Sequence, residues 1–185
     1  SNLFYERRQV KLEVLQGFYD ALDAPMKQHD FGRCIQSYLE LSNRDLLENG
    51  DDFVDFAVFD IKGDTFHLSE RFGDKLTVLE FRSPYCMPSM RNIPEINDLL
   101  KKHGDQVQVY TFCSDTRSGS WNDLNEDGSQ SIKVWDGQGR WGQTGVRYNI
   151  EGSPYLFIIS PEGKILDHWF GYGKGLLEEK VKPHL

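Results

Sequence analysis

The sequence predicts an α/β layered domain with a mixed sheet, preceded by a helical hairpin. Three observations lead to this prediction. From residue 51 onward, short apolar runs typical of buried strands alternate with segments of helical periodicity. Near the end of the chain, two apolar runs flank a turn signal, as the strands of an antiparallel hairpin do. Before residue 50, helical spacing dominates. Strand–helix–strand order followed by a hairpin and a helix defines a mixed sheet flanked by helices.

Residues 1–50 are expected to form an N-terminal helical segment that acts as a linker or a partner surface. Apolar side chains recur with helical spacing over 3–22. Pro25 falls where this helix must break, and Asp30 is predicted to be the N-cap of a second helix. Cys34 lies on the apolar face of that helix, which predicts a buried thiol.

Residues 51–185 carry the α/β pattern and form the second predicted domain. Turn residues separate its elements, as at 62–64 and 161–163. The expected strands are 53–59, 65–68, 76–81, 107–113, 132–135, 155–159 and 164–170. The expected helices run from the loop after residue 81 to about 103, and over 121–124, 142–148 and 175–181.

The composition excludes several classes of function. The chain has 185 residues, of which 21 are Lys or Arg and 29 are Asp or Glu, so its net charge is −8. A net negative chain lacks the electrostatics that drive binding to nucleic acid or anionic membranes. The longest apolar runs, such as 155–159, are far shorter than the roughly 20 residues of a membrane span. No nucleic-acid partner and no transmembrane segment are therefore expected in this chain.

The cysteine count is odd, with thiols at Cys34, Cys86 and Cys113, so at least one is free or pairs outside the chain. Cys113 ends a strand that should lie parallel to the strand leading to Cys86. Both strands would open at the same edge of the sheet, where α/β sites gather. Two interpretations of Cys113 stay open: a buried core thiol, or a thiol that resolves a disulfide on Cys86.

Cys86 carries the strongest functional signal. It ends a loop between a buried strand and a helix, and Pro84 and Pro88 flank it. A sulfur at a helix N-terminus meets free N–H groups and the helix dipole, which stabilise a thiolate. Because the thiolate is the nucleophile in disulfide exchange, this placement predicts a reactive cysteine.

This region resembles the thioredoxin-like thiol–disulfide oxidoreductases, and among them the bacterial TlpA/ResA-like branch. That family shows a strand, then Trp-Cys-x-x-Cys, then a helix with a proline two turns on. Here Tyr85 stands for the Trp, Cys86 is the first cysteine, Pro88 lies inside the motif and Pro94 lies in the helix. Downstream, 152–154 resembles the cis-proline loop of the family. The resemblance covers roughly residues 53–185, and several spaced motifs together are more specific than one.

The chain departs from the family pattern at two positions. Ser89 replaces the second motif cysteine, so the usual dithiol cycle is unavailable. Ser89 is instead expected to donate a hydrogen bond to the Cys86 thiolate. Asn92 stands where the branch often has a glutamate, six residues after the first cysteine.

The resemblance also implies roles for neighbouring residues. Glu80 lies six residues before Cys86, where thioredoxins place a buried acid. Two interpretations of Glu80 stay open: it acts on Cys86 through water, or it is a satisfied strand carboxylate. An apolar lip around the sulfur is expected, and the Ser153 backbone would pair with an extended substrate. The predicted substrate-binding residues are Tyr85, Met87, Pro88, Ser153 and Pro154.

Neither a cofactor nor a metal is expected. The Gly137–Gly142 segment fits G-x-G-x-x-G, but too little chain follows it for a dinucleotide domain. Asp123–Gly128 fits half of a calcium loop, yet Val134 replaces its twelfth-position glutamate. Cys86 and Met90 are spaced for a soft metal, but the histidines show no ligand spacing.

The sequence therefore predicts single-cysteine thiol–disulfide exchange, with Cys86 as nucleophile and a protein, a peptide or a low-molecular-weight thiol as partner. A second hypothesis is a redox-inactive module that binds extended peptides on this fold. A third is a one-cysteine peroxidase, with Ser83 in place of a threonine, although Leu79 occupies the position of the required proline. The resemblance implies a periplasmic or cell-envelope setting in a bacterium.

Overall fold

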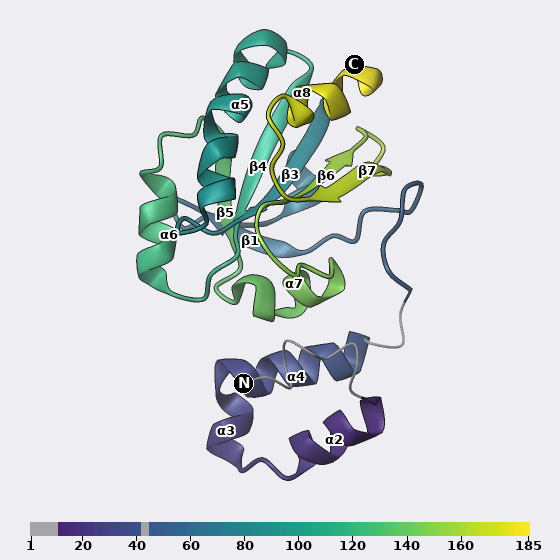
Figure 1. The fold of residues 1–185 in the computed structure, drawn as a ribbon, viewed down its shortest axis with the longest axis vertical. Helices are drawn as coiled ribbons and strands as arrows, with labels where there is room; N and C mark the ends of the chain where they lie inside the picture. Colours follow the sequence, from purple (N-terminus) through teal and green to yellow (C-terminus); the bar gives the residue numbers. More distant parts are fainter. Residues whose placement is uncertain (1–10, 42–44) are drawn as a thin grey trace.

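The computed structural model describes residues 11–41 and 45–185, and it shows an N-terminal group of helices beside an α/β body (Figure 1). The N-terminal helices are α2 (Leu12–Asp20), α3 (Ala24–Gln28) and α4 (Asp30–Leu41). α4 packs against α7 (Gln143–Arg147) and the 3₁₀ turn η2 (Gly139–Trp141) of the body. The division of the chain near residue 50 stays a prediction.

The N-terminal helices differ from the predicted hairpin. The described part of the first helix is α2, and residues 3–10 of the prediction lie outside the described residues. Pro25 does not simply separate two helices: it opens the short helix α3, whose N-cap Asp23 accepts a hydrogen bond from the Met26 N–H at 2.9 Å. The backbone of Asp30 is already helical in α4, so Asp30 is not its N-cap. Cys34 is fully buried, as predicted.

The body is built on one sheet of seven strands among the described residues, in the order β2-β1-β5-β4-β3-β6-β7. β3, β4 and β5 are parallel to one another, whereas β6 pairs antiparallel with β3. β1 and β7 also pair antiparallel with their inner neighbours, so the sheet is mixed as predicted. The strands are β1 (Ala57–Asp60), β2 (Thr65–His67), β3 (Leu76–Arg82), β4 (Val107–Cys113), β5 (Ile132–Trp135), β6 (Tyr155–Ile159) and β7 (Ile165–Phe170).

Helices cover both faces of the sheet. α5 (Met87–His103) and α8 (Leu176–Val181) cover one face over a cluster of aliphatic side chains from β3, β4 and β6. The other face carries aromatic side chains, among them Phe81 and Phe112, which pack with Tyr148 beside α7. α6 (Ser118–Asn125), η1 (Leu68–Arg71) and η3 (Lys182–His184) complete the body. The carboxyl ends of β3, β4 and β5 point toward α6 and α7 (Figure 1).

The predicted strand 53–59 is mostly wrong, because regular pairing begins only at Ala57. The segment before it has other partners: the Gly50 N–H donates to the Ile165 carbonyl and the Phe53 N–H to the Gly163 carbonyl, each at 2.7 Å. The Asp55 carboxylate accepts hydrogen bonds from the Phe56 and Ser69 N–H groups, so side-chain contacts stand here in place of strand pairing.

Candidate active site around Cys86

Cys86 lies where the loop after β3 enters α5, and it is the N-cap residue of that helix. Its N–H donates to the Ser83 carbonyl at 3.2 Å, and the Ser83 hydroxyl donates to the Asp115 carboxylate at 2.8 Å. These contacts fix the loop against the end of β4. Cys86 is partly exposed, unlike Cys34 and Cys113, which are buried.

The cis-proline loop supplies the contact that the sulfur makes. The Cys86 thiol donates to the backbone carbonyl of Ser153 at 2.9 Å, and the Ser153–Pro154 peptide bond is cis. The structure thus brings together residues 67 positions apart in the chain. A carbonyl accepts a hydrogen bond from a thiol but only repels a thiolate, so this contact belongs to the protonated form of Cys86.

Ser89 does not make the predicted hydrogen bond to Cys86. Its side chain is fully buried, and its hydroxyl has no hydrogen-bond partner among the described residues. The physical reason is that the sulfur is turned toward Ser153 and makes no capping contact with α5. An N-cap side chain accepts a hydrogen bond from the N–H of the second or third helical residue, which here are Pro88 and Ser89. Because Pro88 has no N–H, the Ser89 N–H is the backbone donor open to Cys86.

Glu80 is a satisfied strand carboxylate, the second of the two interpretations. It is fully buried on β3. Its Oε1 accepts from Asn92 Nδ2 at 2.9 Å, and its Oε2 accepts from Arg82 Nε at 2.8 Å and Nη2 at 2.5 Å. The Thr111 hydroxyl also donates to Oε2, at 3.2 Å. Asn92, which the sequence marked only as a departure from the family, therefore binds α5 to β3.

Arg82 extends this contact into a buried ionic cluster, which we define as Glu80, Arg82, Asp127 and Lys133. Arg82 Nη1 lies 2.5 Å from the Asp127 carboxylate, and Lys133 Nζ lies 3.5 Å from the other oxygen of Asp127. Burial alone would lower the pKa of Arg82, but the Glu80 and Asp127 carboxylates outweigh it and raise that pKa. Burial lowers the pKa of Lys133, although Asp127 opposes the shift. Apart from Glu80, no sequence pattern indicated this cluster.

The predicted apolar lip is partly formed. Tyr85 and Met87 are exposed beside the sulfur, whereas the Pro154 side chain is buried and contributes little surface. The Tyr85 hydroxyl donates to Asp123 at 2.5 Å, and the Arg117 guanidinium lies 5.2 Å from the centre of the Tyr85 ring. The hydrogen bond to Asp123 raises the pKa of Tyr85.

Phe170 borders the cis-proline loop and was not among the predicted site residues. It is 63% exposed at the end of β7. Its ring packs so closely on Gly152 that a Cβ there would lie 2.7 Å from a ring carbon. The signal that would have identified Phe170 is the hairpin register, which pairs it with Tyr155 next to the cis-proline.

Cys113 is buried at the end of β4, opposite Arg82 in the parallel register. Burial raises the pKa of the Cys113 thiol to about 12, although a hydrogen bond to the Asp115 carbonyl opposes the shift. A thiol with this pKa is protonated at neutral pH and is a poor nucleophile. The structure therefore favours the core interpretation of Cys113 over the resolving one.

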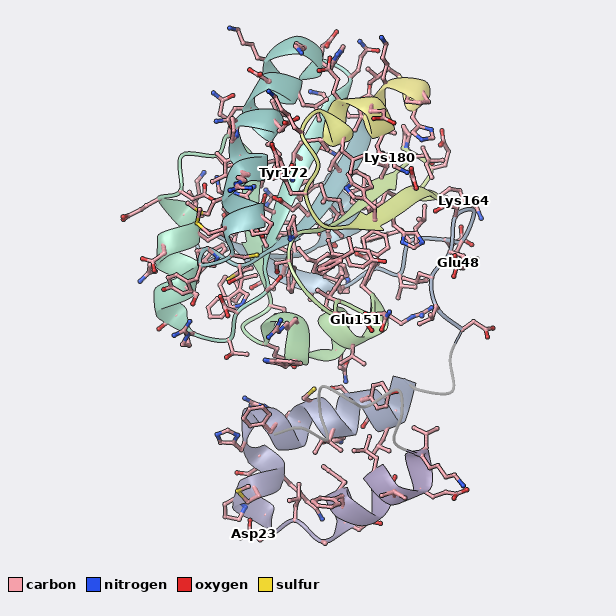
Figure 2. All side chains as sticks on the ribbon, in the orientation of Figure 1. Asp23, Glu48, Glu151, Lys164, Tyr172 and Lys180 are labelled. Carbon is pink, nitrogen blue, oxygen red and sulfur yellow. The ribbon has the colours of Figure 1, made fainter. Side chains whose placement is uncertain are left out.

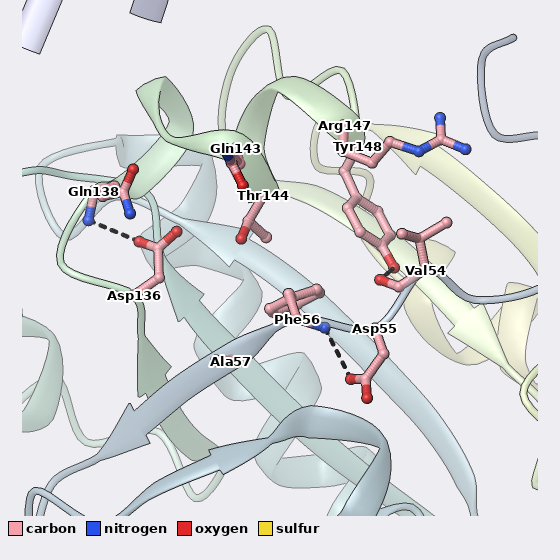
Figure 3. Close-up of a pocket in the computed structure, with 10 residues that line it drawn as sticks. All are labelled: Val54, Asp55, Phe56, Ala57, Asp136, Gln138, Gln143, Thr144, Arg147 and Tyr148. Carbon is pink, nitrogen blue, oxygen red and sulfur yellow. Dashed lines mark hydrogen bonds between the residues drawn. The ribbon is translucent and has the colours of Figure 1, made fainter. Parts of the chain in front are cut away.

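A pocket of about 410 Å³ lies between α7 and the segment before β1, and no predicted site residue lines it (Figure 3). The Asp136 carboxylate on its wall accepts hydrogen bonds from the Gln138 and Gly139 N–H groups, each at 2.8 Å. Burial raises the pKa of Asp136, and these N–H groups oppose the shift. The glycine-rich segment is thus folded around Asp136. In the described part of the chain, no three His, Cys, Asp or Glu side chains form a group that would hold a metal.

The Cys86 side chain and the backbone of the cis-proline loop thus meet where β3 leads into α5, on the body whose side chains Figure 2 draws as sticks. This fold and this placement of the cysteine define a thioredoxin-like protein. No helix of the described chain is both long enough and apolar enough to cross a membrane.

Comparison with known proteins places the chain within that class. The chain is 24% identical over 143 residues to the thiol-disulfide oxidoreductase ResA of Bacillus cereus, covering 76% of this chain and 81% of the relative. No family model matches. Among solved structures, a putative thiol:disulfide interchange protein DsbE from Chlorobium tepidum is 26% identical, with a TM-score of 0.65, and covers 74% of this chain and 97% of its own.

A thiol-disulfide oxidoreductase from Bacteroides fragilis superposes with a TM-score of 0.64 at 24% identity, covering 73% of this chain and all of its own. The chain is therefore a thioredoxin-like protein similar to the TlpA/ResA-like thiol–disulfide oxidoreductases.

Proposed function

We propose that this protein carries out thiol–disulfide exchange through a single cysteine, Cys86. The observation that carries the proposal is a partly exposed thiol at the N-terminus of α5, beside the cis-proline loop, with Ser89 where a second sulfur would stand. The other two thiols, Cys34 and Cys113, are buried. The substrate is a disulfide or thiol of a protein, a peptide or a small molecule.

The exchange proceeds in two steps. The Cys86 thiolate attacks one sulfur of a substrate disulfide, a new S–S bond forms, and the other substrate sulfur leaves as a thiolate that takes a proton from water. A second thiolate from solution then attacks the substrate sulfur of the mixed disulfide, which releases Cys86 as a thiolate. The protein ends in the state in which it began, so the cycle shuffles disulfides without net oxidation or reduction.

Ser89 is proposed to stabilise the thiolate. When Cys86 loses its proton, its contact with the Ser153 carbonyl becomes repulsive, and the sulfur requires donors instead. Ser89 offers its N–H in the first turn of α5 and a buried hydroxyl without a partner among the described residues. A change of the Cys86 χ1 angle to another staggered rotamer, away from the cis-proline loop and toward α5, would bring the sulfur to both donors.

Replacing Ser89 with alanine is expected to slow alkylation of Cys86 by iodoacetamide at pH 7 about threefold to tenfold, because the thiolate loses one hydrogen bond. The rate is measured by mass spectrometry of the peptide that contains Cys86. Ser118→Ala, at an exposed position in α6, is the matched control and should leave the rate unchanged. An unchanged rate in S89A would show that the hydroxyl plays no part.

The cis-proline loop and the lip are proposed to hold the substrate. Tyr85 and Met87 flank Cys86 in the chain and are exposed, the exposed Phe170 ring packs on Gly152, and the Ser153 backbone contacts the sulfur. An extended segment on either side of a substrate cysteine would lie along this surface. By its likeness to the family, we place the protein in the bacterial periplasm or cell envelope, with residues 1–50 as a linker or partner surface.

The test is incubation of the reduced protein with 2-hydroxyethyl disulfide, a small neutral disulfide. One adduct is expected, on Cys86, and addition of a thiol such as 2-mercaptoethanol should remove it. C86A should form none, while C113A should behave as the wild type. If the wild type forms no adduct on Cys86, the exchange function fails. If C86A still binds an unfolded, cysteine-containing peptide as tightly as the wild type, the protein is a binding module instead.

A further inference from the structure

The interface between α5 and the sheet changes in character along its length. Under the second half of the helix it is aliphatic, where Leu76 and Val78 of β3 lie with Ile96 and Leu99 in one core cluster. Side chains on a strand alternate between faces, so Glu80 and Arg82 continue the same face. Under the first half of α5, nearest Cys86, the interface is therefore ionic.

Both oxygens of the Glu80 carboxylate accept hydrogen bonds from other described residues. Arg82 gives it two hydrogen bonds, and Asn92 and Thr111 give one each. The charged groups that face it are Arg82 on its own strand and, beyond Arg82, Asp127 and Lys133 of the α6–β5 loop and β5. The sides formed by α5 and β4 present the uncharged Asn92 and Thr111. Two carboxylates and two cations leave the cluster with no net charge.

We propose that Arg82 is a positioning residue that holds Glu80 as a fixed, neutralised carboxylate and so removes it from the proton chemistry of Cys86. Glu80 is bound to Asn92 of α5, the helix that Cys86 caps. A buried acid beneath such a helix can affect the thiol in two ways: it can take a proton, and its negative charge disfavours the thiolate. The bidentate contact with Arg82 opposes both effects. The inference rests on the proposed reactivity of Cys86.

Removal of Arg82 should restore both effects. In R82M, Glu80 keeps only Asn92 and Thr111 as donors, and its charge is no longer matched. Its field then disfavours the Cys86 thiolate, so the alkylation rate at pH 7 should fall about threefold to tenfold. A second inflection, from Glu80, should appear in the dependence of that rate on pH. Adding E80Q to R82M should restore the alkylation rate and remove the second inflection, because it removes the negative charge that Arg82 had matched.

The experiment compares the pH dependence of iodoacetamide alkylation of Cys86 in the wild type, E80Q, R82M, R82K and E80Q/R82M. We expect one inflection in the wild type and a slower two-step curve for R82M, with recovery in E80Q/R82M. For E80Q we expect a one-step curve that is no slower than the wild type, because its unmatched Arg82 favours the thiolate. R82K keeps the charge and should lie close to the wild type. A purely structural loss in R82M would not be rescued by E80Q.

Two results would overturn the inference: slower alkylation in E80Q alone, which would make Glu80 an active proton acceptor, or a slow R82M that E80Q fails to rescue. Should R82M or E80Q not fold, infrared difference spectra of the wild type against E80Q/R82M settle the question. The Glu80 carboxylate band should persist from pH 5 to 9, and a protonated carboxyl band that follows Cys86 titration would contradict us. Absence of any Cys86 alkylation would instead refute the proposed function.

Discussion

Replacing Arg82 with methionine is expected to lower the free energy of unfolding by about 3–5 kcal/mol, because it leaves a buried charge without its partner. Glu80 and Asp127 would both lose the guanidinium, while Lys133 lies 3.5 Å from Asp127 and reaches only that carboxylate. Both carboxylates are shielded from bulk solvent, since the Glu80 side chain is fully buried and that of Asp127 is 2% exposed. Urea unfolding followed by circular dichroism measures the change.

The double variant E80Q/R82M should lose less stability than R82M, because it removes one charge of each sign and leaves Asp127 paired with Lys133. Lys102→Met is the matched control. It breaks the Lys102–Glu178 pair at 2.8 Å, whose side chains are 49% and 45% exposed, and should barely move the urea midpoint. Equal losses for R82M and K102M would show that the buried ionic cluster is not a stabilising unit.

The central strands could be predicted from the sequence because burial on both sides leaves a clear pattern. The predicted bounds of β4, β5 and β6 match the structure, since each is a short apolar run between turn residues. The N-terminal region was less predictable. A helix break was expected at Pro25, but Asp23 caps a new helix, α3, and Pro25 lies in its first turn, where proline is favoured. The partners of 50–53 lie more than 100 residues away, on the turn before β7 and at its start.

The candidate site likewise has features that the sequence predicted and features that it did not. Cys86 was identified because a strand–helix junction is a local pattern, and the family resemblance indicated the cis-proline loop at residues 152–154. The hydrogen bond between the Cys86 thiol and the Ser153 carbonyl was not predicted. The ionic cluster could not be predicted from the sequence, because Arg82 and Asp127 are 45 positions apart in the chain. Only the folded sheet brings their side chains into contact. The direction of the Cys86 thiol depends on a single rotamer, which no sequence pattern encodes. For that reason the hydrogen bond predicted for Ser89 is absent from the structure.

Replacing Ser89 with cysteine is expected to change the course of the reaction. Ser89 lies three residues after Cys86, at the third position of α5, so the two Cα atoms are separated by one helical turn, a distance that a disulfide spans. A new thiol at this position would attack the mixed disulfide on Cys86 from within and expel the substrate thiol. The variant would then accumulate an internal disulfide between Cys86 and the introduced thiol, which the wild type lacks the second sulfur to form.

Because attack from within the chain replaces attack by a thiol from solution, the S89C adduct with 2-hydroxyethyl disulfide should disappear at least ~100-fold faster than the wild-type adduct without added thiol. Mass spectrometry of quenched samples follows the adduct and the internal disulfide together. S89A, which cannot form the bond, should retain the adduct as the wild type does. A long-lived adduct in S89C would mean that Ser89 is not positioned to reach the sulfur, and the view of this site as a dithiol centre reduced to one sulfur would then be wrong.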